Sequence, residues 1–222
     1  MHPIALAILL TPLGLLLRLY AILPQGKPTK RGVRLVSEPC KLGMFLGSGG
    51  HTTEALTLLS SLDFARYSPR TYIVSCGDTL SAKKAVALES LKASEILAYS
   101  VITIPRARRV HQSLLTTPLT SMQSLATCVY HITLSPLITG VHFADVLLLN
   151  GPGTCVIVCI AVYINRFLGL HSPKLVYVES FARVRRLSLS GKILRFFVDR
   201  FVVQWPELAA ADSKAEYRGW LV

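Results

Sequence analysis

A glycine-rich loop between an apolar run and an amphipathic segment constrains the fold of this chain more than any other feature. The apolar run is Met44–Leu46, small residues follow at 47–50, and His51 opens a segment with apolar residues at helical spacing. This order predicts a strand, a tight loop and a helix. Glycines leave the loop backbone accessible, so N–H groups at the helix start can approach an anion closely. We therefore expect an anion-binding site at residues 47–51.

Short apolar runs recur along the chain with helical patterns between them. They predict six strands, at Met44–Leu46, Tyr72–Val74, Val101–Ile104, Val146–Leu149, Leu175–Val178 and Phe201–Val203. Alternating strands and helices are typical of a doubly wound parallel sheet. The predicted fold class is therefore α/β, with a single Rossmann-like domain over residues 41–222.

Two further apolar stretches are expected to be helical. Residues 106–143 join the third and fourth strands, and their recurrent prolines and hydroxyls favour a broken, partly buried crossover helix with a membrane-facing side over a second membrane span. Residues 155–164 are too few to cross a bilayer, so they predict a buried or interfacial helix.

The N-terminus is apolar over the length of a bilayer. Ile4–Leu23 spans 20 residues with the single charge of Arg18, which predicts a membrane helix with Arg18 reaching toward the surface. No basic residue precedes this run, and bulky residues surround Ala21, where a signal-peptide cleavage site would need small ones. An uncleaved anchor at residues 1–25 is therefore favoured over a signal sequence.

A basic, proline-containing linker at residues 26–40 is predicted to follow the anchor. By the positive-inside rule, its charges place the globular part in the cytosol as the single domain of a single-pass membrane protein. The formal net charge of +12 indicates anionic partners. Nucleic acid is not expected among them, because the membrane accounts for the charge and no nucleic-acid motif is present.

The five cysteines show no paired C-x-x-C spacing. Their odd number and spacing agree with a cytosolic domain, and Cys155 and Cys159 are expected to be buried core thiols. We expect no metal and no cofactor in the predicted site.

A second loop of small residues follows the fourth predicted strand. In a doubly wound sheet, ligands bind where the strand order reverses, at the carboxyl ends of the first and fourth strands. Both loops should therefore line one cleft, each leading into a helix N-terminus that can hold phosphate. The predicted binding residues are Gly47, Ser48, Gly49, Gly50, Thr52, Asn150, Gly151, Gly153 and Thr154.

A dinucleotide site is only a minor alternative. Thr52 stands where the third glycine of that fingerprint would be, and the loop lacks the Lys-Ser/Thr ending of a P-loop. Asp78, just after the second strand, could bind a ribose, but a polar turn residue is the commoner explanation.

Five motifs carry a resemblance to a known family. They are Gly47-Ser-Gly-Gly-His-Thr-Thr-Glu, Asn150-Gly-Pro-Gly-Thr-Cys-Val, Tyr177-Val-Glu-Ser-Phe-Ala-Arg-Val, Leu187-Ser-Leu-Ser-Gly-Lys and Val203-Gln-Trp-Pro. From about Cys40 onward the chain resembles the membrane-anchored subunit of the dolichol-pathway UDP-N-acetylglucosamine transferase, the asparagine-linked glycosylation protein fourteen family. It departs from the family at Ile157, where a proline is usual.

The resemblance implies the N-terminal half of a GT-B glycosyltransferase, with a separate soluble subunit supplying the donor-binding half. Size agrees independently, since about 180 residues after the linker make one such domain and not two. The implied acceptor is dolichyl diphosphate N-acetylglucosamine at the endoplasmic reticulum membrane, and the implied donor is UDP-N-acetylglucosamine. The chain is expected to be inactive alone.

Two residues are candidates for catalysis. His51 projects from the phosphate loop and is the preferred base for the acceptor 4-hydroxyl, with a role in orienting the loop as the alternative. Glu179, after the fifth strand, could act as base, bind a sugar hydroxyl or pair with a neighbouring arginine. Arg183 is expected to bind the diphosphate, whereas Glu54 is expected to interact with the helix dipole only.

Two other function classes stay open on the sequence. The chain could be a membrane tether with an idle cleft, or a self-sufficient nucleotide-dependent enzyme. A transfer assay with and without the soluble partner would separate these possibilities.

Overall fold

The computed structural model describes residues 3–24, 38–92, 99–108, 112–113 and 115–222, although not the side chains of residues 3–10. Residues 25–37, which include most of the linker predicted at 26–40, lie outside this part of the chain. The helices are α1 (Pro3–Ile22), α2 (Gly50–Ser60), α3 (Thr79–Lys92), α4 (Thr117–Val129), the π-helix η1 (Tyr130–Leu134), α5 (Ser135–Thr139), α6 (Thr154–Leu168), α7 (Leu189–Leu194) and α8 (Pro206–Ala211). The strands are β1 (Leu42–Leu46), β2 (Arg70–Ser75), β3 (Tyr99–Ile104), β4 (Val146–Asn150), β5 (Lys174–Val178), β6 (Arg200–Val203) and β7 (Ala215–Tyr217).

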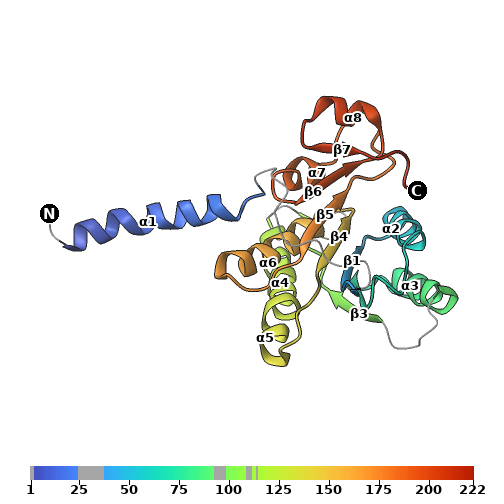
Figure 1. Ribbon diagram of the computed structural model, residues 1–222, viewed down its shortest axis with the longest axis horizontal. Helices are drawn as coiled ribbons and strands as arrows, with labels where there is room; N and C mark the ends of the chain where they lie inside the picture. Colours follow the sequence, from blue (N-terminus) through green and yellow to red (C-terminus); the bar gives the residue numbers. More distant parts are fainter. Residues whose placement is uncertain (1–2, 25–37, 93–98, 109–111, 114) are drawn as a thin grey trace.

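All strands belong to one parallel sheet with the order β3-β2-β1-β4-β5-β6-β7. The six predicted strands and the Rossmann-like α/β class are confirmed, and Figure 1 shows the sheet running through the middle of the domain. The sequence did not predict β7, because it has only three residues and follows a polar stretch. The strand order reverses between β1 and β4, as a doubly wound sheet requires.

Helices cover both faces of the sheet, so its central strands are buried on both sides. On one face, Phe45, Leu149 and Tyr177 pack with residues of α4, η1 and α6. On the other face, Met44 and Tyr72 pack with residues of α2 and α3. Alternate residues of β1 thus enter two different cores, which fixes the register of the strand.

The crossover between β3 and β4 contains a continuous run of helical turns, in which the π-helix η1 joins α4 to α5, so the predicted break is only this change of helix type. Pro118 is the second residue of α4, Pro136 is the second residue of α5, and Gly140 caps the end of α5 in the left-handed region at φ 70°. The apolar side chains exposed along it are Leu119, Met122, Tyr130, Leu134, Leu137 and Ile138. The next predicted helix is also confirmed, since α6 buries seven of its residues.

The N-terminal helix α1 projects from the domain, and its C-terminal end contacts α6 (Figure 1). The guanidinium of Arg18 donates to the carbonyl oxygens of Arg166 (2.9 Å) and Phe167 (3.1 Å) in the last turn of α6, at the negative end of that helix. Within the described residues, no helix is both long and apolar enough to cross a bilayer. Part of the expected span, residues 4–10, lies outside the side chains that the structure describes.

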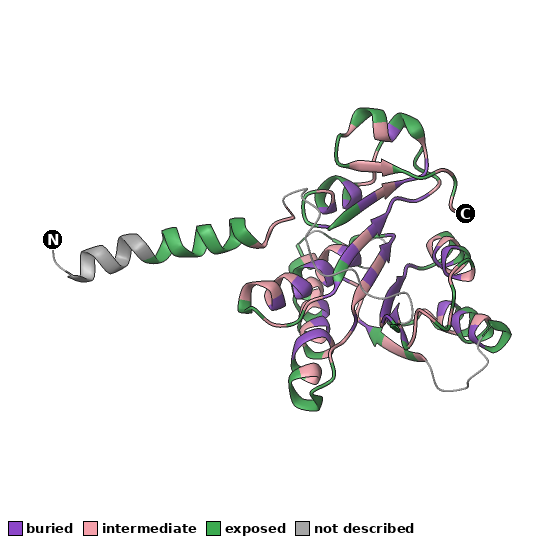
Figure 2. Ribbon diagram, in the orientation of Figure 1, coloured by how far each residue is buried: buried purple, intermediate pink, exposed green. Residues whose placement is uncertain are grey.

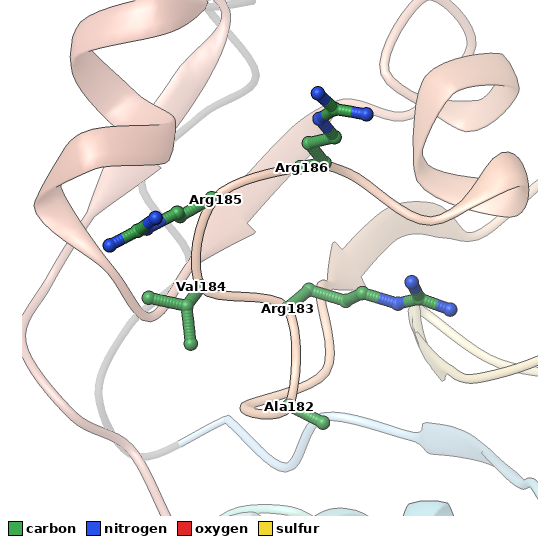
Figure 3. A pocket seen from close by; sticks show the side chains of 5 residues that line it. All are labelled: Ala182, Arg183, Val184, Arg185 and Arg186. Atoms are coloured by element: carbon green, nitrogen blue, oxygen red, sulfur yellow. The ribbon is translucent and has the colours of Figure 1, made fainter.

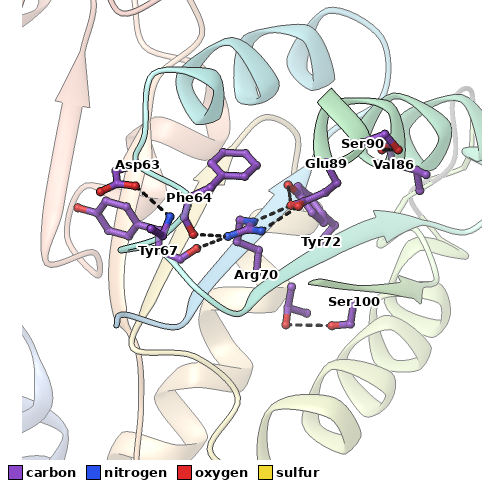
Figure 4. A network of polar contacts seen from close by, with 11 residues as sticks. Asp63, Phe64, Tyr67, Arg70, Tyr72, Val86, Glu89, Ser90 and Ser100 are labelled. Atoms are coloured by element: carbon purple, nitrogen blue, oxygen red, sulfur yellow. Dashed lines mark hydrogen bonds and ion pairs between the residues drawn. The ribbon is translucent and has the colours of Figure 1, made fainter. Parts of the chain in front are cut away.

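A buried ion pair fastens β2 to α3 (Figure 4). Two nitrogens of Arg70 donate to the two carboxylate oxygens of Glu89, at 2.7 and 2.9 Å, and both side chains are almost fully buried. The third nitrogen donates to the carbonyls of Phe64 and Tyr67, and Tyr72 donates its hydroxyl to Glu89 at 2.5 Å. Burial, followed by the neighbouring Glu89, raises the pKa of Tyr72, so this tyrosine remains a donor.

The buried state predicted for Cys155 and Cys159 is confirmed. Burial raises the pKa of Cys159 to about 12 and that of Cys155 well above its ordinary value. Cys40 and Cys128 are also buried, and Cys76 is exposed after β2.

Candidate functional site

Both predicted glycine loops lie at the carboxyl edge of the sheet, at its topological switch point. Strands β1 and β4 are neighbours, and their register pairs Leu46 with Asn150, the last residue of each strand. The chain therefore leaves the sheet twice at adjacent positions, once into residues 47–49 and once into residues 151–153. The two loops therefore lie next to each other at this edge of the sheet, as predicted.

The first loop presents an accessible helix start. Ser48, Gly49 and Gly50 are exposed, and Gly49 caps α2 at φ 67° and ψ −127°, a conformation that only glycine adopts readily. Gly47 is buried, and a Cβ there would lie 2.7 Å from the Cβ of His51. The backbone N–H groups of Thr52 and Thr53 donate to the carbonyl of Gly49. The N–H groups of residues 50 and 51, at the start of α2, are therefore the ones that can bind an anion.

The second loop is more closed. The N–H groups of Cys155 and Val156, the second and third residues of α6, donate to the carbonyls of Pro152 and Gly153. Gly151 has φ 126°, and a Cβ there would lie 3.2 Å from the ring of His51. The absence of a side chain at Gly151 allows the loop after β4 to pack against the ring of His51. Gly153, in contrast, has open space around it.

A chain of hydrogen bonds joins the start of α2 to the ends of β4 and β5 around His51. Nδ1 of His51 lies 3.2 Å from Oδ1 of Asn150. The amide nitrogen of Asn150 donates to Glu54 (3.0 Å) and to the carbonyl of Val178 (3.3 Å), and Ser180 donates its hydroxyl to the other carboxylate oxygen of Glu54 at 2.8 Å. Side chains from the start of α2 and the ends of β4 and β5 are thereby held together.

The bonds of Asn150 determine which histidine nitrogen carries the proton. Both partners of its amide nitrogen are acceptors, so that nitrogen must be the NH2 group and the atom facing His51 must be the carbonyl oxygen. A carbonyl oxygen only accepts, so Nδ1 of neutral His51 is the protonated nitrogen and Nε2 carries the lone pair. Asn150 is completely buried, which holds this arrangement in one orientation.

Three polar residues considered in the sequence serve the loops themselves. Thr52 is buried, and its hydroxyl donates to the carbonyl of Gly47 and contacts Ser81. Asp78 accepts from the backbone and hydroxyl of Ser81, which is the turn role expected for it. Thr154 is also buried and accepts from the backbone of Ala107.

Glu179 holds the segment between β5 and α7. One carboxylate oxygen accepts from the backbone and hydroxyl of Ser188, both at 3.0 Å, and the other accepts from the N–H of Ser180 at 3.1 Å. The side chain is 1% exposed. Within the described chain no ion pair joins it to Arg183 or its neighbours, so the pairing expected as the ordinary outcome is not the one found. A Cβ at Gly191 would overlap the carboxylate, so glycine is needed there.

Tyr177 adds a neutral donor under the second loop. Its hydroxyl donates to the carbonyl of Gly151 at 3.3 Å and lies 3.3 Å from the hydroxyl of Ser188. Burial, followed by the charge of Glu179, raises the pKa of Tyr177. The hydroxyl group of Tyr177 therefore stays protonated, and its hydrogen bond to Gly151 supports the second loop beside His51.

Arg183 lies in an exposed basic loop after β5. Residues 182–186 line an open hollow of about 490 Å³, and Figure 3 shows the side chains of Arg183, Arg185 and Arg186 pointing in different directions from the loop. The lining residues do not include either glycine loop. Arg195, at the end of α7, pairs with Asp212 at 2.6 Å.

Sequence reasoning assigned no site role to Ser180 and only a helix-dipole role to Glu54. Glu54 follows His51 by three positions, so one helical turn places both on the same side of α2. That spacing is the only signal in the sequence for their association. Ser180 has none, because its contact with Glu54 depends on the order of the strands.

The chain matches the family described as "Oligosaccharide biosynthesis protein Alg14 like" over residues 42–221. It is 45% identical to the UDP-N-acetylglucosamine transferase subunit ALG14 of Cryptococcus neoformans, over 95% of this chain and 92% of that protein. The same-named subunit of Schizosaccharomyces pombe is 50% identical over 79% of this chain and 80% of that protein, and that of Homo sapiens is 39% identical over 94% and 92%.

A solved structure with partial overlap is that of a ugt transferase from Siraitia grosvenorii in complex with UDP. It has a TM-score of 0.38 and 18% identity over 63% of this chain and 28% of that chain. An overlap of this extent is no basis for a functional comparison.

Proposed function

The chain belongs to the Alg14 family of oligosaccharide biosynthesis proteins, and from this membership we propose that it is the acceptor-binding subunit of a two-chain UDP-N-acetylglucosamine transferase. It holds dolichyl diphosphate N-acetylglucosamine at the endoplasmic reticulum membrane. A separate soluble subunit binds UDP-N-acetylglucosamine and completes the active site. Together they add the second N-acetylglucosamine of the N-glycan precursor.

The hydrogen-bonded chain from Ser180 through Glu54 and Asn150 to His51 is the observation that supports this assignment. It lies where ligands bind in doubly wound sheets, and it directs the proton of His51 to Nδ1. An unprotonated Nε2 is the form of histidine that can accept a proton from a hydroxyl group.

The reaction proceeds by attack of the acceptor 4-hydroxyl oxygen on the anomeric carbon of the donor sugar. The new bond is between that oxygen and the anomeric carbon, and the bond that breaks joins the anomeric carbon to the diphosphate of UDP. His51 takes the hydroxyl proton on Nε2, and the charge of Glu54, transmitted through Asn150, stabilises the imidazolium that forms.

The acceptor diphosphate binds at the first glycine loop. The N–H groups at the start of α2 and the positive end of that helix face the anion, and Arg183 closes over it from the basic loop. Ser48, Gly49 and Gly50 are the exposed members of the first loop, and Gly151 and Gly153 shape its neighbour. Thr52 and Thr154 hold the two loops from beneath.

Glu179 is a positioning residue in this proposal and takes no part in the chemical step. Because its carboxylate is buried and bonded to Ser188, it fixes the loop that carries Arg183 and does not reach the acceptor directly. Replacing it should therefore weaken acceptor binding more than it slows the chemical step.

The helix α1 serves as a single-pass membrane anchor, with the domain on the cytosolic side and the soluble partner recruited to it. The apolar length of residues 4–23 and the basic residues after it support this arrangement. Arg18 then links the end of the anchor to the end of α6, so the domain is held directly against the membrane surface.

A transfer assay tests the proposal. The full chain is co-expressed with the soluble donor-binding subunit, and transfer of N-acetylglucosamine to a polyprenyl diphosphate N-acetylglucosamine acceptor is measured. His51→Gln should lower kcat by about 10²–10⁴-fold while the partner is still recruited, and His131→Gln, a change of the same type remote from the loops, should leave kcat unaltered.

Two outcomes would contradict the proposal. Full transfer by the His51→Gln complex, with recruitment intact, would favour a tether whose cleft is idle. Transfer by this chain without any partner would favour a self-sufficient enzyme.

A further inference from the structure

Two histidines and an aspartate converge at the edge of the sheet opposite to the glycine loops. His142 and Asp145 precede β4, and His171 precedes β5. Because β4 and β5 are parallel neighbours, their starting points lie together. One ligand atom from each of the three side chains lies within 4.8 Å of the other two.

The geometry points to a site for a divalent transition metal, with zinc as the best fit, and we propose that the chain binds one there. Nε2 of His142 lies 3.3 Å from Oδ1 of Asp145. Two atoms that bind one tetrahedral zinc ion at about 2.0–2.1 Å lie about 3.3 Å apart. The observed spacing is thus that of two ligands of the same ion.

The two atoms are close but do not form a hydrogen bond. Nε2 of His142 is shielded from solvent and has no hydrogen-bond partner among the described residues, even though a carboxylate oxygen is near. A nitrogen and an oxygen that are misaligned for a mutual bond can both direct their lone pairs to a third point. The ring of His171 lies beside that of His142, with centroids 4.3 Å apart.

The surrounding bonds hold the three residues in place. The backbone N–H of Lys41 donates to the other carboxylate oxygen of Asp145, Oδ2, at 2.8 Å. Such a bond to the second carboxylate oxygen is the usual support of a metal-binding carboxylate. Asn165 donates to the backbone carbonyl of His171 at 3.0 Å and fixes the loop that carries it.

The donor set selects the metal. Two imidazoles and one carboxylate suit zinc and its transition-metal neighbours, whereas Mg²⁺ and Ca²⁺ prefer oxygen ligands alone. His171 is exposed, so water can complete the coordination and the ion can exchange with solvent. A cavity of about 160 Å³ lined by both histidines adjoins the site.

A bound ion would join three segments that meet at this edge. Asp145 bonds to Lys41, where the chain enters β1 from the linker, and His171 follows the end of α6 that Arg18 of α1 caps. The metal would therefore stabilise the part of the domain nearest to α1. It is remote from the glycine loops, so transfer does not depend on it for chemistry.

Calorimetric titration of the full chain with Zn²⁺ tests the proposal. The protein carries no polyhistidine tag, is purified in detergent and is stripped with a chelator. One equivalent of Zn²⁺ should bind, Mg²⁺ should not, and Zn²⁺ at a hundredfold excess over Kd should raise Tm by about 5–10 °C. His171→Gln, at an exposed position, should weaken zinc binding by at least about 10–100-fold.

His131→Gln is the matched control, since it removes a histidine of the same domain that is not part of the cluster. It should leave zinc binding unchanged. Absence of zinc binding in the wild-type chain would overturn the proposal, and so would binding that persists at full strength in both His142→Gln and His171→Gln.

Discussion

Replacing Glu89 with alanine removes the carboxylate that neutralises the buried guanidinium of Arg70. The two residues share two hydrogen bonds of 2.7 and 2.9 Å, and their side chains are 1% and 2% exposed. The arginine would keep its carbonyl partners at Phe64 and Tyr67 but would have a buried charge with no counter-charge. Breaking a buried pair on one side costs about 3–5 kcal/mol.

This cost is a large share of the stability of an ordinary domain, about 5–15 kcal/mol. For a chain of this size each kcal/mol lowers Tm by about 2–4 °C, so Glu89→Ala should lower it by about 6–20 °C. Thermal unfolding of the detergent-solubilised full chain, followed by far-UV circular dichroism, measures the shift.

The double variant Arg70→Met, Glu89→Leu separates two effects on stability: the loss of the ion pair itself, and the cost of leaving the Arg70 charge buried without a counter-charge. Since it removes both charges and keeps apolar volume, but also removes the partners of the Phe64 and Tyr67 carbonyls, it should recover part of the stability that Glu89→Ala loses. A loss below about 1 kcal/mol in Glu89→Ala, or a double variant no more stable than the single one, would refute this reasoning.

Three shorter predictions concern other parts of the domain. Cys76 should be the single thiol that reacts with a mild thiol reagent in the native chain, with the other four reacting only on unfolding, and fast reaction of a second thiol would contradict the burial found here. Gly191→Ala should destabilise the domain by about 1–3 kcal/mol in denaturant unfolding, because a Cβ there displaces the Glu179 carboxylate from its bonds; an unchanged midpoint would exclude that contact. Burial alone would raise the pKa of Asp212, but the hydrogen bond from Arg195 and its other partners hold it below the ordinary value of 3.8. A carboxyl group whose pKa is lower in the folded state stabilises the fold at pH values above its unfolded pKa. The free energy of unfolding of the wild type should therefore exceed that of Asp212→Asn at neutral pH, and this difference should shrink as pH falls below about 4. A difference that stays constant with pH would contradict the ion pair's contribution.

The sequence predicted the sheet because strand and helix signals alternate without interruption. The runs at Met44–Leu46 and Val146–Leu149 were recognisable as strands, and glycines after each marked the sheet edge where ligands are expected to bind. β7 was missed because three residues of mixed polarity give no periodic signal.

Contacts that depend on strand order could not be read from the sequence. Asn150 and Ser180 are 30 positions apart along the chain and meet through Glu54 only because β4 and β5 are neighbours. For the same reason, His142 and His171 have no sequence signal as a pair. Glu179 was assigned a possible catalytic role from its position after a strand, and only the packed loop revealed its bonds to Ser188.

The most direct test of the central claim is binding of the acceptor by this chain without the soluble partner. Calorimetry of the detergent-solubilised full chain with a short-chain polyprenyl diphosphate N-acetylglucosamine measures it, with Gly49→Arg and Gly140→Arg compared. Both glycines have positive φ and open space around them, but only Gly49 belongs to the first glycine loop. The wild-type chain and Gly140→Arg should bind the acceptor, and Gly49→Arg should bind it at least about tenfold more weakly, equivalent to about 1.4 kcal/mol. Equal binding by the two variants, or no binding by the wild-type chain alone, would contradict an acceptor site at the β1–β4 switch point.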